Sequence, residues 1–237
     1  MSRWQWVQRT QPSRFWRFAS PLLALFLTVL LAMLLFVALG KDPWQGLQVF
    51  FWEPIKSGYA WGELLLKATP LLLIGLGLAL CFRSNVWNIG AEGQFIAGAI
   101  AAGSVALTAD ADTGRWIVLP ILLAGMAGGM AWAGIAAWLR DRFHASEILV
   151  SLMLVYVAEQ VLGWLVGGPL KDPMGYNFPQ SKTFEAATQI PLLFAGSRLH
   201  IGLLLALVGV AVLWVFFFRT RPGFARQVGG WAPAAAR

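Results

Sequence analysis

Six long apolar stretches constrain this chain more than any other feature. They cover residues 21–39, 64–82, 93–108, 116–139, 148–166 and 199–218. A membrane-spanning helix needs roughly 20 apolar residues, so the stretch 93–108 is the shortest candidate. Only 12% of the residues are charged, against about 25% in a typical soluble domain. The chain is therefore predicted to be an all-α polytopic integral membrane protein with about six transmembrane helices.

The basic residues indicate how these helices are oriented. If the N-terminus is cytoplasmic, the inner segments hold Arg3, Arg9, Arg14, Arg17, Arg83, Arg140, Arg142, Arg219, Arg221, Arg226 and Arg237. The outer segments then hold Lys41, Lys56, Arg115, Lys171, Lys182 and Arg198. This asymmetry fits the positive-inside rule, so the net charge of +7 is a topology signal. Binding to nucleic acid would require a basic patch on a folded face, which the pattern does not indicate.

A polar, glycine-bearing segment interrupts the apolar pattern between the second and third stretches. Ser84, Asn85, Asn88, Glu92 and Gln94 lie within it. Polar side chains are costly near hydrocarbon unless they are buried in protein or line a wet cavity. The segment is therefore predicted to be broken rather than a plain helix. Glu92 has a simpler explanation, because a carboxylate in the first turn of a helix complements the helix dipole.

Two of the predicted spans carry small residues at four-residue spacing. The first set is Gly98, Ala102 and Ala106, and the second is Gly125, Gly129 and Ala133. Small residues let membrane helices approach closely where lipid provides no hydrophobic driving force. These two spans are expected to be central and packed rather than facing lipid.

The sequence contains little that suggests catalysis. No GxxxxGK[ST] motif for ATP phosphates is present, Cys81 is the only cysteine, and His144 and His200 are isolated. Glu159 lies twelve residues after Glu147, or ~18 Å along a helix. An intramembrane carboxylate is a functional candidate, although a partner in the bundle or access to water would also explain it. Because the carboxylates are dispersed, a membrane-embedded enzyme is the weaker alternative and no cofactor is expected.

A longer pattern identifies a family. Residues 64–95, LLLKATPLLLIGLGLALCFRSNVWNIGAEGQF, resemble permease subunits of ABC importers in the branched-chain amino acid and simple-sugar class. The NIGAEGQ core points to the nucleoside and simple-sugar branch. Residues 146–154, 167–173 and 221–237 resemble further family segments in the same order. The family usually has Asn where this chain has Val155, which removes the basis for a substrate role there.

The resemblance implies an ATP-driven, alternating-access importer of a bacterial inner membrane. Its domains would be a basic cytoplasmic arm (1–20), a transmembrane permease domain (21–218) and a segment that docks on the ATPase (219–237). The partners implied are a separate ABC ATPase subunit that binds the ATP, a second permease subunit and an extracytoplasmic binding lipoprotein. Family members continue through further spans, so the chain is expected to be C-terminally truncated. A non-transporting fragment or scaffold partner is the alternative.

Two hypotheses concern particular residues. In the first, residues 85–94 form a non-helical or broken segment at the solute pathway, where Asn85, Asn88 and Gln94 offer amides to a polar solute. The alternative is that these three residues only pin helix ends in a cytoplasmic turn. In the second, the docking segment inserts into a groove of the ATPase, with Gly229 and Pro233 shaping a turn. The candidate residues are Asn85, Asn88, Glu92, Gln94 and Glu159 for the pathway, and Gly223, Gly229, Pro233, Ala235 and Ala236 for docking.

Overall fold

The structure is a computed structural model that describes residues 13–194 and 196–232. These residues form two compact units that divide between Leu64 and Leu65, and each unit is described by itself. Helices make up the regular structure of both, and within the described residues the β-structure is limited to an isolated bridge between Leu192 and His200. Five helices are long and apolar enough to cross a membrane. The predicted all-α membrane architecture is confirmed.

The first unit contains one long helix and a run of short helical turns. Its elements are α1 (Arg14–Ala38), α2 (Pro43–Leu47), the π-helical η1 (Gln48–Trp52) and the 3-10 turn η2 (Glu53–Ile55). Asp42 caps α2, because its carboxylate accepts hydrogen bonds from the Trp44 and Gln45 backbone N–H groups at 2.8 and 3.4 Å. The ring of Phe36 covers Gly46, where a Cβ would lie 2.6 Å from it. The short turns therefore fold back onto the end of α1.

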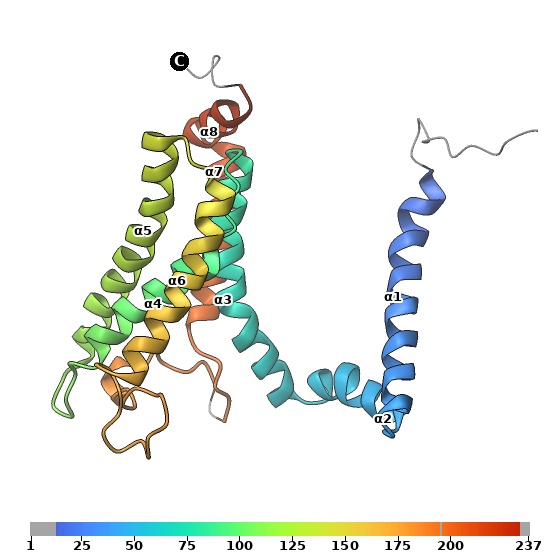
Figure 1. The fold of residues 1–237 in the computed structure, drawn as a ribbon, viewed down its shortest axis with the longest axis horizontal. Coiled ribbons are helices and arrows are strands. Elements are labelled where there is room, and N and C mark those ends of the chain that lie inside the picture. The colour runs from blue at the N-terminus through green and yellow to red at the C-terminus, as the bar shows by residue number, and fades with distance from the viewer. Residues whose placement is uncertain (1–12, 195, 233–237) are drawn as a thin grey trace, which may run out of the picture. The chain divides into compact units, whose positions relative to one another are not determined.

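The second unit is a helical bundle. Helix α3 (Gly58–Arg83) begins in the first unit and is followed by α4 (Ala91–Ala106), η3 (Arg115–Ile117), α5 (Val118–Phe143) and α6 (Glu147–Gly167). A long loop containing η4 (Ala186–Thr188) leads to α7 (Gly202–Arg219) and the short α8 (Arg221–Trp231). Helix α4 packs on α5 and α6, which also contact each other, and α8 folds onto the end of α7 (Figure 1).

Helix α4 corresponds to the shortest of the six predicted stretches. It has 16 residues, which is ~24 Å at 1.5 Å per residue, and it is not among the five helices that are long and apolar enough to cross a membrane. The residues 84–90 that precede it are not helical and are called the polar break below. This arrangement confirms the predicted break between the second and third stretches.

The small-residue faces of α4 and α5 pack against each other, as predicted. A Cβ added to Gly98 would lie 2.9 Å from the Gly125 carbonyl oxygen, and one on Gly125 would lie 3.3 Å from the Ala102 Cβ. Close packing covers only one face of α5. Its opposite face exposes large apolar side chains, among them Met126 at 61% and Met130 at 65%.

Candidate functional site

The polar break begins with a left-handed turn at the end of α3. Asn85 has φ +54°, a conformation that asparagine tolerates better than most residues. The turn lets the Val86 N–H reach the Cys81 carbonyl at 2.9 Å and the Asn85 N–H reach the Phe82 carbonyl at 3.1 Å. These bonds satisfy carbonyls that the end of a helix leaves unpaired. Asn85 therefore stops α3, and its exposed side chain does not line the cavity described below.

The rest of the break lies along one face of α6. The Trp87 N–H donates to the Glu147 carboxylate at 2.8 Å, and the Ile89 N–H donates to the Ser151 hydroxyl at 3.2 Å. Ser151 lies one helical turn, or ~6 Å, beyond Glu147. A Cβ on Gly90 would lie 2.7 Å from the Ser151 carbonyl oxygen. The backbone of the break therefore enters the bundle before α4 begins, and side chains of α6 accept hydrogen bonds from the Trp87 and Ile89 N–H groups.

Gly93, in the first turn of α4, continues this line of contact. A Cβ there would lie 3.0 Å from the Val155 Cα and 3.1 Å from the Leu154 carbonyl oxygen. Val155 is buried against it, with 7% of its surface exposed. The position where the family usually has Asn is thus used for close packing between α4 and α6, and it does not line the cavity.

Asn88 and Gln94 bond to each other through both ends of their amides. The Asn88 Nδ2 donates to the Gln94 Oε1 at 3.1 Å, and the Gln94 Nε2 donates to the Asn88 Oδ1 at 3.2 Å. The Gly90 N–H also donates to the Asn88 Oδ1 at 2.9 Å. Because a backbone N–H can only donate, it determines which atom of Asn88 is the oxygen, and the reciprocal pair then orients Gln94.

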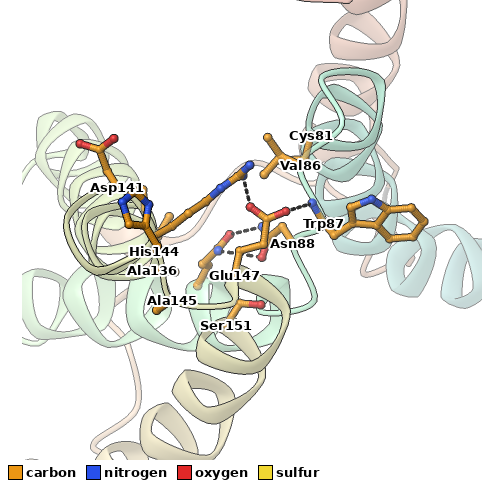
Figure 2. Close-up of a pocket in the computed structure, with 14 residues that line it drawn as sticks. Cys81, Val86, Trp87, Asn88, Ala136, Asp141, His144, Ala145, Glu147 and Ser151 are labelled. Carbon is orange, nitrogen blue, oxygen red and sulfur yellow. Dashed lines mark hydrogen bonds and ion pairs between the residues drawn. The ribbon is translucent and has the colours of Figure 1, made fainter. Parts of the chain in front are cut away.

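These two amides line a cavity of about 680 Å³ between the break, the C-terminal end of α5 and the N-terminal end of α6. Figure 2 shows Glu147, on α6, and Asn88, in the break, among the residues that line this space. The cavity is bordered by Cys81, Val86, Trp87, Asn88, Gln94, Ala133, Ala136, Ala137, Arg140, Asp141, His144, Ala145, Glu147 and Ser151. It combines a mostly small and apolar wall with a few polar groups, as small-molecule sites do.

Glu147 and Arg140 are two charged cavity residues that the sequence analysis did not select as site candidates. The Arg140 guanidinium pairs with the carboxylate of Glu147, which also accepts from the Trp87 N–H. One side chain in the first turn of α6 thereby joins α5, α6 and the break. The available signal was the capping pattern at the start of α6, where the Ser146 hydroxyl accepts from the Leu149 N–H at 3.5 Å. Serine is a common N-cap residue, and the cap places Glu147 in the first turn of α6.

The other pathway candidates do not meet at this cavity. Glu92 lies exposed in the first turn of α4, and Glu159 lies exposed on α6, twelve residues beyond Glu147. Neither borders the space lined by Asn88 and Gln94. Residues 85–94 also do not form one broken segment, because α4 begins at Ala91 and takes in residues 91–94. Among the described residues, no group of three or more His, Cys, Asp or Glu side chains is arranged to hold a metal ion.

The docking candidates fall on α8 and beyond. Thr220 caps α8 by accepting from the Gly223 N–H at 3.2 Å. Gly223 is buried against the Phe216 carbonyl, where a Cβ would overlap the oxygen. Gly229 lies inside α8, so the prediction that it shapes a turn is wrong: the helix continues to Trp231. Pro233, Ala235 and Ala236 lie outside the described residues.

Comparison with known proteins places these features in a family. The chain is 36% identical to a glucose ABC transporter permease protein of Haloferax volcanii, over 97% of this chain and 62% of that protein. It is 28% identical to a guanosine ABC transporter permease protein of Bacillus subtilis, over 92% of this chain and 62% of the relative. A nucleoside ABC transporter permease protein of Lactococcus lactis is 27% identical over 91% of this chain and 61% of its own length. The chain thus spans about three fifths of these relatives.

No solved structure matches the chain. The family model described as "branched-chain amino acid transport system / permease component" matches residues 61–237. That match includes the break, the cavity and α8. The chain therefore belongs to the branched-chain amino acid transport permease family of ABC transporters.

Proposed function

We propose that this chain is a membrane-spanning component of an ATP-driven importer that carries a nucleoside or simple sugar across a bacterial inner membrane. The observation that carries the proposal is the amide pair of Asn88 and Gln94 on the wall of the cavity. Glucose and guanosine, named for two of the relatives, are uncharged and rich in hydroxyl groups. Amides recognise such solutes, because each one both donates and accepts hydrogen bonds.

The amide pair retains bonding capacity. Each NH₂ group uses one hydrogen in the pair, and the Gln94 Oε1 accepts one bond. The Asn88 Oδ1 already accepts two bonds. The second Asn88 hydrogen is directed to the Cys81 thiol, so one Gln94 donor and one acceptor site remain for a solute. The cavity volume of about 680 Å³ also lies within the roughly 300–1,000 Å³ typical of small-molecule sites.

We place the cavity at the cytoplasmic end of the bundle. The elements that meet there are the C-terminal ends of α3 and α5, the N-terminal end of α6, and α8. The basic residues Arg83, Arg140, Arg142, Arg221 and Arg226 belong to these elements, and Arg219 ends α7 immediately before α8. Arginines concentrated at one end of a bundle mark the cytoplasmic side. The N-terminus of the chain then also lies in the cytoplasm.

We assign α8 to contact with a separate ATPase subunit. The helix is pinned to α7 by the Thr220 cap and by the Gln227 side chain, whose Nε2 donates to the Phe217 carbonyl at 3.4 Å. The helix also exposes Phe224 and Arg226. A basic helix with an exposed aromatic residue suits a groove on a protein partner. A second permease subunit and a binding lipoprotein would complete the importer.

Uptake assays test the role of the amide pair. The complete transporter that contains this chain is assayed for uptake of labelled guanosine, uridine and glucose, with Asn88→Ala and Gln94→Ala as variants. Loss of one or two hydrogen bonds of about 1 kcal/mol each predicts about a tenfold fall in apparent affinity for the transported solute. Gln160→Ala is the matched control, because Gln160 is exposed on α6 and does not line this cavity.

Normal uptake by both variants at normal membrane levels would refute the pathway role of the pair. The scaffold alternative makes a different prediction. A scaffold complex would show no stimulation of ATP hydrolysis by any of the three solutes in reconstituted membranes, even without substitutions.

A further inference from the structure

Helix α8 contacts the polar break directly, with the backbone of Gly230 against the backbone of Ser84. A Cβ added to Gly230 would lie 2.5 Å from the Ser84 carbonyl carbon and oxygen and 2.9 Å from its Cα. Ser84 is the first residue after α3. The last turn of α8 therefore presses backbone against backbone on the start of the break, so a displacement of this turn is passed on without being absorbed by a flexible side chain.

The opposite end of α8 is built as a pivot. Thr220 separates α7 from α8 with an extended conformation, φ −120° and ψ 148°. Its hydroxyl donates to the Phe216 carbonyl at 2.6 Å and accepts from the Gly223 N–H at 3.2 Å. The first turn of α8 is thus tied to α7, while Gly230 lies near its far end. Rotation about Thr220 moves Gly230, and Ser84 with it, farther than any residue near the pivot.

The break is held to α6 by bonds that can be exchanged for water. The Trp87 and Ile89 N–H groups donate to side chains of α6, namely Glu147 and Ser151, and not to a sheet or helix ladder. Asn88 lies between these two docked residues and pairs with Gln94 of α4. A shift of the break along α6 consequently moves Asn88 relative to Gln94, on the wall of the cavity.

We propose that residues 84–90 are the element through which movement of α8 reaches the solute cavity, with Gly230 on Ser84 as the point of contact. The inference rests on the proposed function, since it needs an ATPase to move α8. When the ATPase displaces α8, the break slides on the face of α6 that carries Glu147 and Ser151. The Asn88–Gln94 pair then opens, and its amides are released to bind or discharge a solute. Gly230 is a positioning residue, because it touches no solute.

Gly230→Ala tests the contact in the complete transporter, reconstituted with its ATPase subunit. The added methyl group forces Ser84 and α8 apart, which disturbs the transmission but leaves the nucleotide site of the ATPase intact. We expect at least about fivefold fewer solute molecules transported per ATP hydrolysed, whatever the absolute rate of hydrolysis. Gly163→Ala is the matched control, because a Cβ there meets nothing within 4 Å, and its transport per ATP should be unchanged.

Hydrogen–deuterium exchange provides a readout that needs no substitution. In the unsubstituted complex, trapping the ATPase with a non-hydrolysable ATP analogue should raise amide exchange in a peptide covering residues 84–90 by about tenfold, because the Trp87 and Ile89 N–H groups leave their partners. Exchange within α6 should stay constant. This measurement decides the question if Gly230→Ala fails to accumulate in the membrane.

The outcomes separate the two proposals. Absence of ATP-dependent uptake by the unsubstituted complex would overturn the proposed function. Normal uptake by that complex, together with an unchanged transport ratio in Gly230→Ala or unchanged exchange of residues 84–90, would overturn the coupling contact alone.

Discussion

The contact between α4 and α5 makes a sharp prediction about Gly128. A Cβ at this position would lie 2.6 Å from the Ala101 Cβ and 2.9 Å from the Ala97 carbonyl oxygen. Carbon atoms in contact normally lie about 3.5–4.0 Å apart, so Gly128→Ala forces the two helices apart by roughly 1 Å. Both neighbours are backbone or a Cβ, and no change of rotamer relieves the overlap.

Overpacking of this kind costs about 1–3 kcal/mol. In a protein of this size, 1 kcal/mol corresponds to roughly 2–4 °C in melting temperature. Gly128→Ala should therefore lower the apparent Tm by about 2–12 °C, measured as loss of the monodisperse gel-filtration peak after heating in detergent. Helix propensity alone predicts the opposite sign, since Ala is favoured over Gly by about 1 kcal/mol in a helix.

Gly134→Ala is the matched control on the same helix. A Cβ at Gly134 meets nothing within 4 Å, so only the propensity term remains and the apparent Tm should stay constant or rise by a few degrees. Equal melting temperatures for the two variants would refute the close approach of α4 and α5 at Gly128.

Further predictions concern the break and α8. Glu147→Ala should lower the apparent Tm by a few degrees, because the Trp87 N–H and the Arg140 guanidinium lose their acceptor, at about 0.5–1.5 kcal/mol for a hydrogen bond that water can partly replace. Glu147→Gln, which keeps an acceptor oxygen, should cost less in the same melt. Gly223→Ala should detach α8 from the Phe216 carbonyl, seen as faster tryptic cleavage within residues 219–226 of the folded protein. Asn85→Val should destabilise the protein by about 1–2 kcal/mol, since φ +54° disfavours a β-branched residue, whereas Asn85→Gly should be close to neutral in the same Tm assay. Identical proteolysis rates or melting temperatures for any of these pairs would contradict the contact concerned.

Much of the fold could be predicted from the sequence, because helix length and helix ends are local properties. The predicted stretch 148–166 corresponds to α6 (Glu147–Gly167), and Ser146, a residue type common at helix starts, caps it. The position of the break followed from a run of polar residues between apolar ones. The third predicted stretch is not among the five helices long enough to cross, because its helix has only 16 residues and follows non-helical backbone.

The candidate site could be predicted only in part. Asn88 and Gln94 were selected because amides near a membrane core need partners, but so were Asn85, Glu92 and Glu159, which do not line the cavity. The family resemblance covered the same segment but did not distinguish the residues that line the cavity from those that do not. Which side chains face one space depends on how the break turns and where α4 starts, and neither is encoded in residue type alone.

The sequence by itself determined which segments are helices, where the polar interruption falls and which faces are small enough to pack, since each depends on residues within a few positions of one another. The tertiary structure alone decided that Glu147 satisfies the Trp87 N–H, 60 residues away in the chain, and that Gly230 presses on Ser84. Such pairings depend on the depth and register at which whole helices meet. Depth and register are set by the sum of many close contacts between backbones, so they cannot be predicted from any single residue.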